Sequence, residues 1–289
     1  MEYYLENDYL KVKINSFGAE LKEIYNKKNN TEYMWNSNKE HWGKSSPILF
    51  PNIGKFNNNK YLLNGKVYTL SKHGFARENE FEFYNKSENS LSLILNSSDK
   101  TMEVFPFEFS LIVTYLLSGK EITVSWTVIN NSNDKMYFAI GGHPAFNAPL
   151  KDGVRSDCYF YFDKEEIYST LVDIKTGYLL DTKLTYKLNN GYLNITDDLF
   201  KDDALVIENQ DLNHISICGK DKKPYVTLIT DAPVVGLWSI SDKAPFVCIE
   251  PWYGICDKTN YNDSIEKRPY QNSLASGETF YKSYKIIIH

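Results

Sequence analysis

The feature that most constrains this chain is a long succession of short apolar segments separated by turn residues. Leu10, Val12 and Ile14 alternate with lysines, which is the period-two pattern of a strand with one solvent-facing side. No long stretch carries the ~3.6-residue apolar period of a substantial helix. The pattern predicts an all-β chain. Because no blade motif of ~40 residues repeats, it favours stacked antiparallel sheets over a propeller.

The strand pattern extends almost to the C-terminus. Asn64-Gly65 lies between two apolar segments and predicts a tight hairpin within 61–70, because both residues tolerate positive φ. Turns of helix are expected only near 39–42 and after Asp263, and 164–201 is expected to form long connections with short strands. Further strands are predicted at 81–84, 91–95, 109–116, 121–129, 136–140, 159–162, 205–207, 214–217, 225–229, 235–240, 246–249 and 284–288.

Length and charge limit the classes of protein to which the chain can belong. We expect a single domain over 1–289, because sandwiches reach this size and no Pro-rich or Ser-rich linker interrupts the chain. The net charge of −5 provides no basic footprint for nucleic acid. No apolar run approaches the ~20 residues that span a bilayer, and the N-terminal residues do not resemble a signal peptide. The expected protein is cytoplasmic, without a nucleic-acid or membrane partner, and a monomer or a homodimer.

Cysteine and histidine spacing gives little sign of metal or covalent chemistry. The four cysteines, Cys158, Cys218, Cys248 and Cys256, form no CxxC pair and are expected to be buried, reduced thiols. His73 and His143 have no ligand-type partner at short spacing, so neither a metal nor another cofactor is predicted. A Gly-x-Ser-x-Gly elbow is also absent from the sequence, which disfavours nucleophilic catalysis.

The segment Gly141-Gly142-His143-Pro144 directly follows a strand-like apolar run. The glycines are expected to adopt dihedrals closed to other residues, and proline fixes the next φ, so the segment would present the His143 imidazole at a strand end facing a cleft. The alternative is a turn histidine satisfied by a neighbouring carbonyl.

Three other segments place polar groups in stiff or apolar surroundings. The Ser45–Lys55 loop could present Asn52 and Lys55, although the loop taken alone favours a simply solvated lysine at position 55. Lys72 to Arg77 contains His73 and Arg77, with a structural salt bridge of Arg77 as the alternative.

Glu250 is the third of these groups, because it ends an apolar strand just before Pro251 and Trp252. Desolvation there should raise the carboxyl pKa towards the range of a general base, although a buried structural glutamate would look the same. With His143 as acid and Trp252 as a stacking surface, the set predicts acid–base catalysis on a polyhydroxylated substrate. His143 and Glu250 are expected to face one another across a cleft wide enough for a single pyranose ring.

The segments Lys72 to Arg77 and Gly142 to Asn147, followed by the strand-end Glu250, resemble the aldose 1-epimerase (galactose mutarotase-like) family. The Ser46 to Gly54 loop is similar to that of a lactose-operon-associated bacterial subgroup of this family. The resemblance implies a galactose mutarotase-like β-supersandwich of stacked antiparallel sheets. The implied activity is interconversion of the α and β anomers of an aldose, without a cofactor.

The resemblance also implies roles for individual residues. His143 would protonate the ring oxygen as general acid, and Glu250 would deprotonate the anomeric hydroxyl as general base. His73 and an aspartate, with Asp203 preferred over Asp202, would bind the sugar. Lys55 stands where galactose mutarotases carry a substrate-binding arginine, which weakens the case for galactose.

Three alternatives to a free-sugar epimerase follow from the same residues. A branch of the family acts on hexose 6-phosphates, and Lys44, Lys55, Lys72 and Arg77 would form a phosphate pocket if they converged. A non-catalytic carbohydrate-binding or sensing protein would retain the cleft without turnover. A glycoside-cleaving enzyme is disfavoured, because it needs two carboxylates and only Glu250 is evident.

Overall fold

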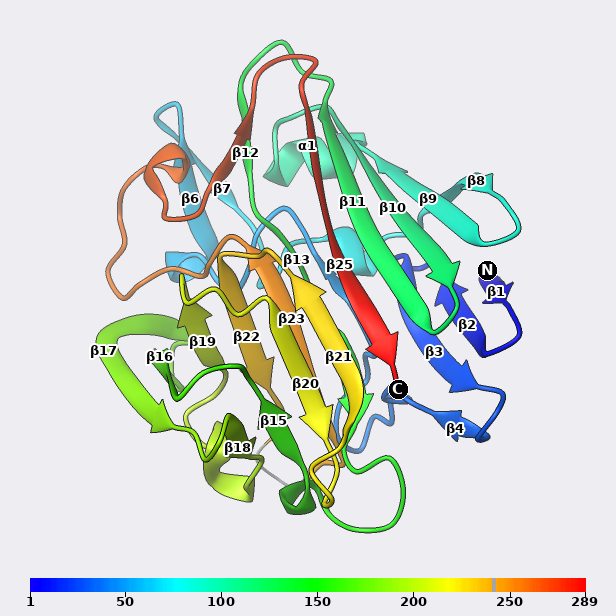
Figure 1. The fold of residues 1–289 in the computed structure, drawn as a ribbon. Coiled ribbons are helices and arrows are strands. Elements are labelled where there is room, and N and C mark those ends of the chain that lie inside the picture. Colours follow the sequence, from blue (N-terminus) through cyan, green and yellow to red (C-terminus); the bar gives the residue numbers. More distant parts are fainter. Residues whose placement is uncertain (241–242) are drawn as a thin grey trace.

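The computed structural model describes residues 1–240 and 243–289. Two large antiparallel sheets, here named the backing sheet and the site sheet, form most of this part of the chain (Figure 1). The backing sheet has the order β18 (Tyr192–Asn194), β15 (Tyr159–Tyr161), β20 (His214–Cys218), β21 (Pro224–Thr230), β25 (Thr279–Ile288), β11 (Glu121–Asn130), β10 (Phe109–Ser118), β9 (Ser90–Asn96), β8 (Glu82–Lys86). The site sheet has the order β17 (Tyr178–Lys187), β16 (Glu166–Asp173), β19 (Leu205–Glu208), β22 (Val234–Trp238), β23 (Phe246–Tyr253), β13 (Ile140–Gly142), β5 (Ile48–Leu49), and β14 (Ala145–Asn147) also pairs with β23.

Smaller elements surround the two sheets. A separate antiparallel sheet contains β1 (Glu2–Glu6), β2 (Leu10–Asn15), β3 (Glu20–Asn26) and β4 (Thr31–Glu32). Two strand pairs are β6 (Lys60–Leu63) with β7 (Lys66–Thr69) and β12 (Met136–Phe138) with β24 (Asn272–Leu274). The helical segments are α1 (Asp99–Val104) and the 3₁₀ turns η1 (Asn57–Asn59), η2 (Ala76–Glu78), η3 (Arg155–Asp157), η4 (Asp197–Phe200) and η5 (Ile265–Lys267).

The apolar core lies between the two large sheets. Leu237 and Ile249 of the site sheet share one buried cluster with Leu228 and Ile286 of the backing sheet. The C-terminal strand β25 lies between β21 and β11, so it joins strands from the two halves of the chain (Figure 1). Each fully buried Leu or Ile contributes roughly 1.5–3 kcal/mol relative to exposure, which is why the two inner faces stay together.

Strand β23 is buried on both faces. Val247 and Ile249 belong to the cluster between the sheets. Because successive strand side chains point to opposite faces, Cys248, Glu250 and Trp252 face away from the backing sheet. Cys248 and Trp252 accordingly belong to other apolar clusters, and Glu250 and Trp252 line a pocket. One strand therefore contributes both to the core and to the opposite surface of the site sheet.

Several sequence predictions are confirmed by this architecture. The hairpin β6–β7 turns at Asn64 and Gly65, with φ of 49° and 76°. A 3₁₀ turn, η5, follows Asp263, and the four cysteines are buried and free.

Among the described residues, no helix is both long and apolar enough to cross a membrane.

Other predictions are wrong. Residues 164–201 contain the eight-residue β16 and the ten-residue β17, which form a long hairpin rather than short strands. The pattern was weak because β17 is an edge strand with many exposed positions. Residues 39–42 form a turn closed by the His41 and Trp42 amides on the Asn38 carbonyl, not a helix. Helix α1 was missed because six residues are too short to show a helical period.

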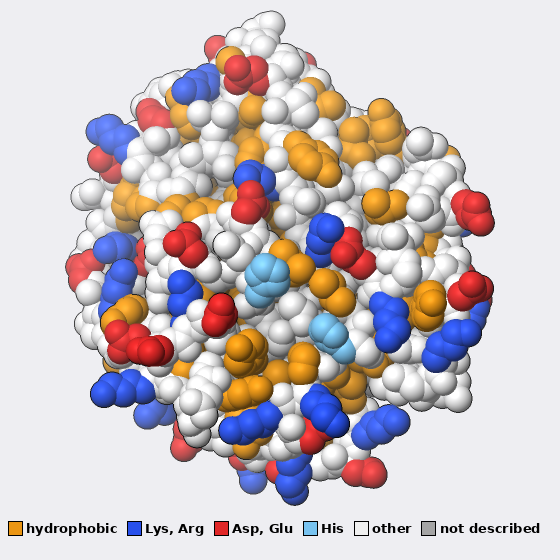
Figure 2. Space-filling view, viewed as in Figure 1, with side chains coloured by type: hydrophobic (Ala, Val, Ile, Leu, Met, Phe, Trp, Pro, Cys, Tyr) orange, Lys and Arg blue, Asp and Glu red, His pale blue; other side chains and the backbone are white. Residues whose placement is uncertain are grey.

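The charge distribution on the surface is mixed. Figure 2 shows acidic and basic side chains intermingled over the face seen in Figure 1. A nucleic-acid footprint needs a continuous basic stripe, and the viewed face has none among the residues described.

Candidate active site

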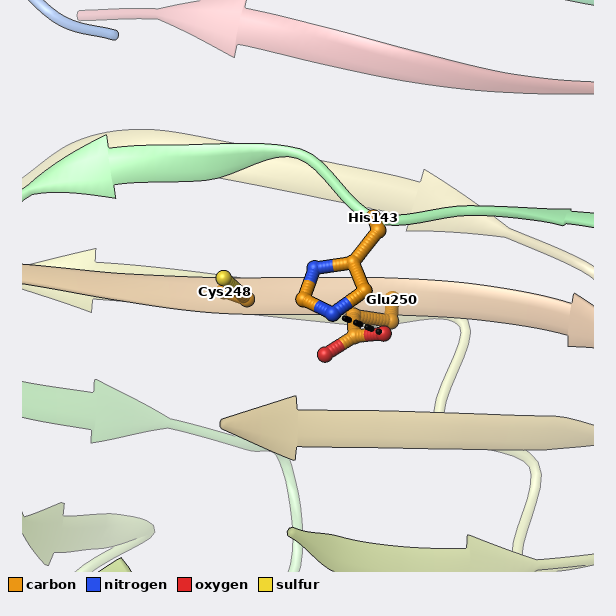
Figure 3. Close-up of side chains that lie close together, drawn as sticks. All are labelled: His143, Cys248 and Glu250. Carbon is orange, nitrogen blue, oxygen red and sulfur yellow. Dashed lines mark ion pairs between the residues drawn. The ribbon is translucent and has the colours of Figure 1, made fainter. Parts of the chain in front are cut away.

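The pairing of strands around β23 places His143 opposite Glu250. Strand β13 pairs Gly141 with Trp252, and β14 rejoins β23 in the same register at Ala145. Continuing this register across the gap between β13 and β14 makes His143 and Glu250 direct cross-strand neighbours, whose side chains meet on one face. His143 Nε2 lies 3.2 Å from Glu250 Oε2. Figure 3 shows the imidazole reaching over β23 towards this carboxyl group.

The expectation that a pyranose ring fits between these two side chains is wrong, because 3.2 Å leaves no room for one. The acid–base chemistry that the resemblance implies would need the two groups side by side rather than on opposite sides of the sugar. The ring oxygen and the anomeric oxygen of an aldose are bonded to the same carbon, so an acid and a base acting on them must approach from neighbouring positions.

The expected role of the two glycines is also wrong. Gly141 and Gly142 are extended strand residues, and neither has a positive φ. They are needed because neighbours approach closely. A Cβ on Gly141 would lie 2.8 Å from Trp252 Cδ1, and one on Gly142 would lie 3.2 Å from the Tyr284 ring. The alternative of a turn histidine held by a carbonyl does not fit either, because His143 Nδ1 has no hydrogen-bond partner within the described chain.

A pocket of about 170 Å³ opens beside this pair on the face of the site sheet that points away from the backing sheet. The strands of the site sheet contribute Val172, Val206, Trp238, Glu250 and Trp252. The connecting segments contribute Trp42, Gly54, Lys72, His73, Arg77, His143, Gly177, Asp203, Ala204 and Cys256. The pocket therefore has a rigid floor of strands and walls made of loops.

Gly236 makes room for the aromatic part of the floor. It pairs with Glu250 on the β22 side of β23, and a Cβ there would lie 2.6 Å from Trp252 Cζ2. The Trp252 side chain is only 5% exposed, yet it lines the pocket.

Burial sets the protonation of the pair. It lowers the pKa of His143 to about 3, and the positive charges of Lys72 and Arg77 act in the same direction. Burial also raises the pKa of Glu250 well above its ordinary value, helped by Asp203 and opposed by Lys72 and the Trp252 indole. At a pH between these two pKa values the two groups together hold one proton. The pair is then either neutral, with the proton on Glu250, or ionic, as imidazolium and carboxylate.

The polar atoms of the pair are not saturated. The 3.2 Å contact lacks hydrogen-bond alignment, and Glu250 Oε2, His143 Nδ1 and Trp252 Nε1 are buried without a hydrogen-bond partner in the described part of the chain. Each such atom costs roughly 1–3 kcal/mol of stability. Polar atoms left unpaired at this cost are the ones a polar ligand would satisfy.

His73 is held quite differently. Its Nδ1 accepts a hydrogen bond from the Gly54 amide at 3.1 Å, and its own amide donates to the Gly54 carbonyl at 2.8 Å. Burial lowers the pKa of His73 well below its ordinary value, with the Lys72 charge adding to the effect. A neutral ring that accepts at Nδ1 carries its proton on Nε2, so His73 is a hydrogen-bond donor of fixed tautomer.

The other predicted binding residues divide into two groups. Asp203, Arg77 and Trp252 line the pocket, whereas Asp202 does not. Asn52 and Lys55 are also outside the lining.

The contacts of Asn52 and Lys55 explain why neither side chain lines the pocket. Asn52 Nδ2 donates to the Gly54 carbonyl at 2.9 Å, so this side chain supports the loop that bonds His73. Lys55 Nζ donates to the Thr176 carbonyl at 3.3 Å.

Sequence reasoning missed two aromatic residues of the site, Trp42 and Trp238, which both line the pocket. Trp238 lies within the strand predicted at 235–240, but the face on which its side chain lies became clear only from its pairing with Cys248. Trp42 lies in a turn, where no periodic pattern assigns a side to the residue.

The three side chains of Figure 3, His143, Cys248 and Glu250, offer metal-ligand atoms within 4.8 Å of one another. The sequence spacing did not indicate this convergence. Burial, reinforced by Glu250, raises the pKa of the Cys248 thiol well above its ordinary value. A metal would have to displace protons from a thiol and a carboxyl group that both resist ionisation, so acid–base chemistry fits these residues better.

Comparisons with known proteins show the family of the chain. The sequence model of the aldose 1-epimerase family matches residues 1–263. The chromosomal LacX protein of Lactococcus lactis subsp. lactis is 30% identical over 298 residues, covering 100% of this chain and 99% of that protein.

Two solved structures are similar over the whole chain. A galactose mutarotase related enzyme from Lactobacillus acidophilus is 34% identical, with a TM-score of 0.93 over 100% of this chain and 97% of that one. A galactose mutarotase-like protein from Lactobacillus casei is 30% identical, with a TM-score of 0.91 over 100% of both chains. The all-β chain thus has the galactose mutarotase-like fold and belongs to the aldose 1-epimerase family.

Proposed function

We propose that this protein is an aldose 1-epimerase that interconverts the α and β anomers of an aldohexose by opening and reclosing the sugar ring. The observation that carries the proposal is the His143–Glu250 pair, whose side chains lie 3.2 Å apart in the lining of a pocket. Family membership supports sugar isomerisation as the reaction class.

The proposed reaction returns every proton to its origin. Glu250 carboxylate takes the proton of the anomeric hydroxyl while His143 imidazolium protonates the ring oxygen, and the bond between C1 and the ring oxygen breaks. The open aldehyde then rotates about C1–C2. On closure, His143 takes the proton from the C5 hydroxyl as its oxygen attacks C1, and Glu250 returns a proton to the carbonyl oxygen.

Burial gives this cycle its driving force. A dry site penalises charge on both groups, so the ionic form of the pair is the reactive one and the ring-opening transfers neutralise it. The Lys72 ammonium favours the carboxylate form of Glu250 but disfavours the imidazolium form of His143. The charge of Lys72 therefore acts in opposite directions on the two halves of the reactive pair.

The remaining lining residues are proposed to hold the sugar. His73 Nε2–H is positioned as a donor to a ring or hydroxyl oxygen, and the Asp203 carboxylate as an acceptor of sugar hydroxyls. Trp252 offers an aromatic face to the apolar side of the ring. Asn52 and Lys55 act, on this proposal, through the loops that they support rather than by touching the sugar.

Polarimetry tests the proposal. Freshly dissolved α-glucose, α-galactose and their 6-phosphates should equilibrate faster with protein than in buffer alone. Binding of a sugar by calorimetry without faster equilibration of any sugar would instead support the non-catalytic binding protein and overturn the enzyme.

A hexose-6-phosphate 1-epimerase is the second candidate, because Lys72 lines the pocket without an ion-pair partner in the described residues. Arg77 also lines the pocket, but its Nε lies 3.6 Å from Glu78 Oε1 and its Nη2 donates to the Lys72 carbonyl at 2.9 Å. The other two candidate cations are engaged elsewhere, since Lys44 contacts Glu78 and Lys55 bonds Thr176. A higher kcat/KM for the 6-phosphate than for the free sugar, lost in Lys72→Met, would favour this candidate.

We also propose that residues 1–289 act as one domain. Strand β25 joins the two halves of the backing sheet, and one apolar cluster contains both Leu5 and Ile288. A single cooperative unfolding transition by two spectroscopic probes would support this, and separate transitions would contradict it.

A further inference from the structure

We propose that Trp42 is a positioning residue for the proposed epimerase reaction, holding the His143 imidazole in line with Glu250 by stacking on its face. The inference rests on the proposed function for its kinetic consequence. The stacking itself can be tested without any sugar.

Two tryptophan rings contact the His143 imidazole, one stacked on its face and one edge-on. The Trp42 ring stacks on the imidazole with 4.8 Å between centroids and 29° between planes. Trp238 meets the imidazole edge-on at 5.4 Å, with 84° between planes. Trp42 also packs edge-on against Trp238 at 5.4 Å, so the three rings form one contact group at the pocket.

Stacking has to orient this ring because a hydrogen bond does not. Catalytic histidines are usually held by a hydrogen bond to the nitrogen that does not react, which fixes both the ring plane and the tautomer. In the described chain, His143 Nδ1 has no such partner. The neighbouring His73 has one, to the Gly54 amide. The indole of Trp42 is therefore the contact that sets the plane of His143.

The position of Trp42 is itself fixed from its backbone. Its carbonyl accepts a hydrogen bond from Trp35 Nε1 at 2.8 Å, and its amide donates to the Asn38 carbonyl at 2.9 Å. Two residues further, Lys44 Nζ lies 3.0 Å from Glu78 Oε1. A residue in a loop without helix or strand is thus held firmly enough to position another side chain.

The stack has two chemical effects on His143. It keeps water off one face of the imidazole, which contributes to the burial that lowers the pKa of His143. It also offers an indole π face to the imidazolium, and such contacts favour the cation by roughly 0.5–2 kcal/mol. The same ring therefore excludes solvent and supports the charged form during turnover, without a hydrogen bond that would lock the tautomer.

Two variants separate positioning from simple packing. Trp42→Phe retains an aromatic face, and Trp42→Ala removes it. We expect Trp42→Ala to lower kcat by roughly 10–100-fold with a smaller change in KM, since misplacing a reacting group by ~1 Å can cost ~100-fold. Trp42→Phe should stay within about threefold of the wild type, which is the rescue that a positioning role requires.

NMR titration of the histidine rings gives a readout that needs no substrate. In Trp42→Ala, the pKa of His143 should rise from about 3 towards its ordinary value as water reaches the ring, whereas Trp42→Phe should leave it low. If His143 titrates identically in all three proteins, the stack is refuted. If the titration shifts but kcat does not, the positioning role is refuted. Absence of turnover in the wild type would overturn the proposed function while leaving the titration result to decide the stack.

Discussion

His73 and His143 lie in one pocket, with 6.0 Å between their ring centroids, yet they are held in opposite ways. Both are buried and both have a lowered pKa. His73 is tied by a hydrogen bond at Nδ1, which fixes its tautomer and makes it a permanent donor. His143 is held by aromatic stacking and faces Glu250, so it can gain and lose a proton. If the proposed function holds, the comparison means that burial alone does not make a histidine an acid or a base, because two buried rings with lowered pKa values differ in the way in which each is held.

The largest expected effect comes from replacing Glu250, the carboxyl group that faces His143. Glu250→Gln should lower the rate of anomer equilibration by roughly 10²–10⁴-fold, because an amide cannot take the hydroxyl proton. Polarimetry at saturating sugar measures it. Glu32→Gln is the matched control, since burial also raises the pKa of Glu32, to about 7, but this residue does not line the pocket. Full activity in Glu250→Gln would remove the acid–base pair from the mechanism.

The second prediction concerns the pH dependence of stability. The pKa of His143 is about 3 in the folded protein and near its ordinary value of 6.5 in the unfolded chain. At His143 the unfolded chain therefore binds more protons between these values, so the contribution of His143 to stability falls as the pH drops through this window, whereas the raised pKa of Glu250 gives a contribution of opposite sign. One such histidine removes about 2 kcal/mol between pH 6.5 and pH 5.

The measurement is urea unfolding at these two pH values. His143→Asn should show a smaller loss of stability than the wild type, and His73→Asn should behave likewise because its pKa is lowered in the same direction. Equal losses in the wild type and both variants would mean that neither ring is neutral when buried.

A smaller effect should separate the two histidines in catalysis. His73→Asn keeps an acceptor for the Gly54 amide and suits the φ of 66° at this position, but it loses the Nε2–H donor. We expect KM to rise by roughly 5–30-fold with kcat nearly unchanged, the effect of one lost hydrogen bond to substrate. His143→Asn should instead lower kcat. A kcat loss in His73→Asn as large as that in His143→Asn would erase the distinction.

The smallest effect is expected at Lys55, which supports the side of the pocket near His73 without lining it. Lys55→Met should change KM by less than about threefold, since only one partly buried hydrogen bond to the Thr176 carbonyl, outside the pocket lining, is lost. Steady-state kinetics with the preferred sugar measures this. A change in KM as large as that of His73→Asn would restore Lys55 as a sugar-binding residue.

Short, distinctive sequence segments allowed us to predict several residues that line the pocket. His73, Arg77, His143 and Glu250 all converge on the pocket as the order of their segments implied. The distance between His143 and Glu250 was not predictable, because it depends on the pairing of strands about a hundred residues apart, which no local pattern encodes.

The same limit explains the missed residues. Trp238 reaches the pocket through the pairing of β22 with β23, and Trp42 through contacts of a turn with distant rings. The long hairpin β16–β17 was missed because an edge strand buries too little for its period to show. The sequence singled out Gly141 for an unusual backbone dihedral, whereas the structure requires glycine there because the Trp252 ring approaches closely. That contact was not predictable, because Trp252 lies far along the chain.

The antiparallel register that brings His143 opposite Glu250 makes the distance between these two groups independent of the loops that form the pocket walls. Selection can act on the distance and on the loops separately. The distance between acid and base follows from strand pairing, with strands ~4.8 Å apart, and is as durable as the sheet itself. Lys72, Arg77 and Asp203, by contrast, lie on connections that can lengthen or change without disturbing that pairing. On the proposed function, sugar preference can therefore diversify among descendants of one chain while the proton-transfer step is inherited unchanged.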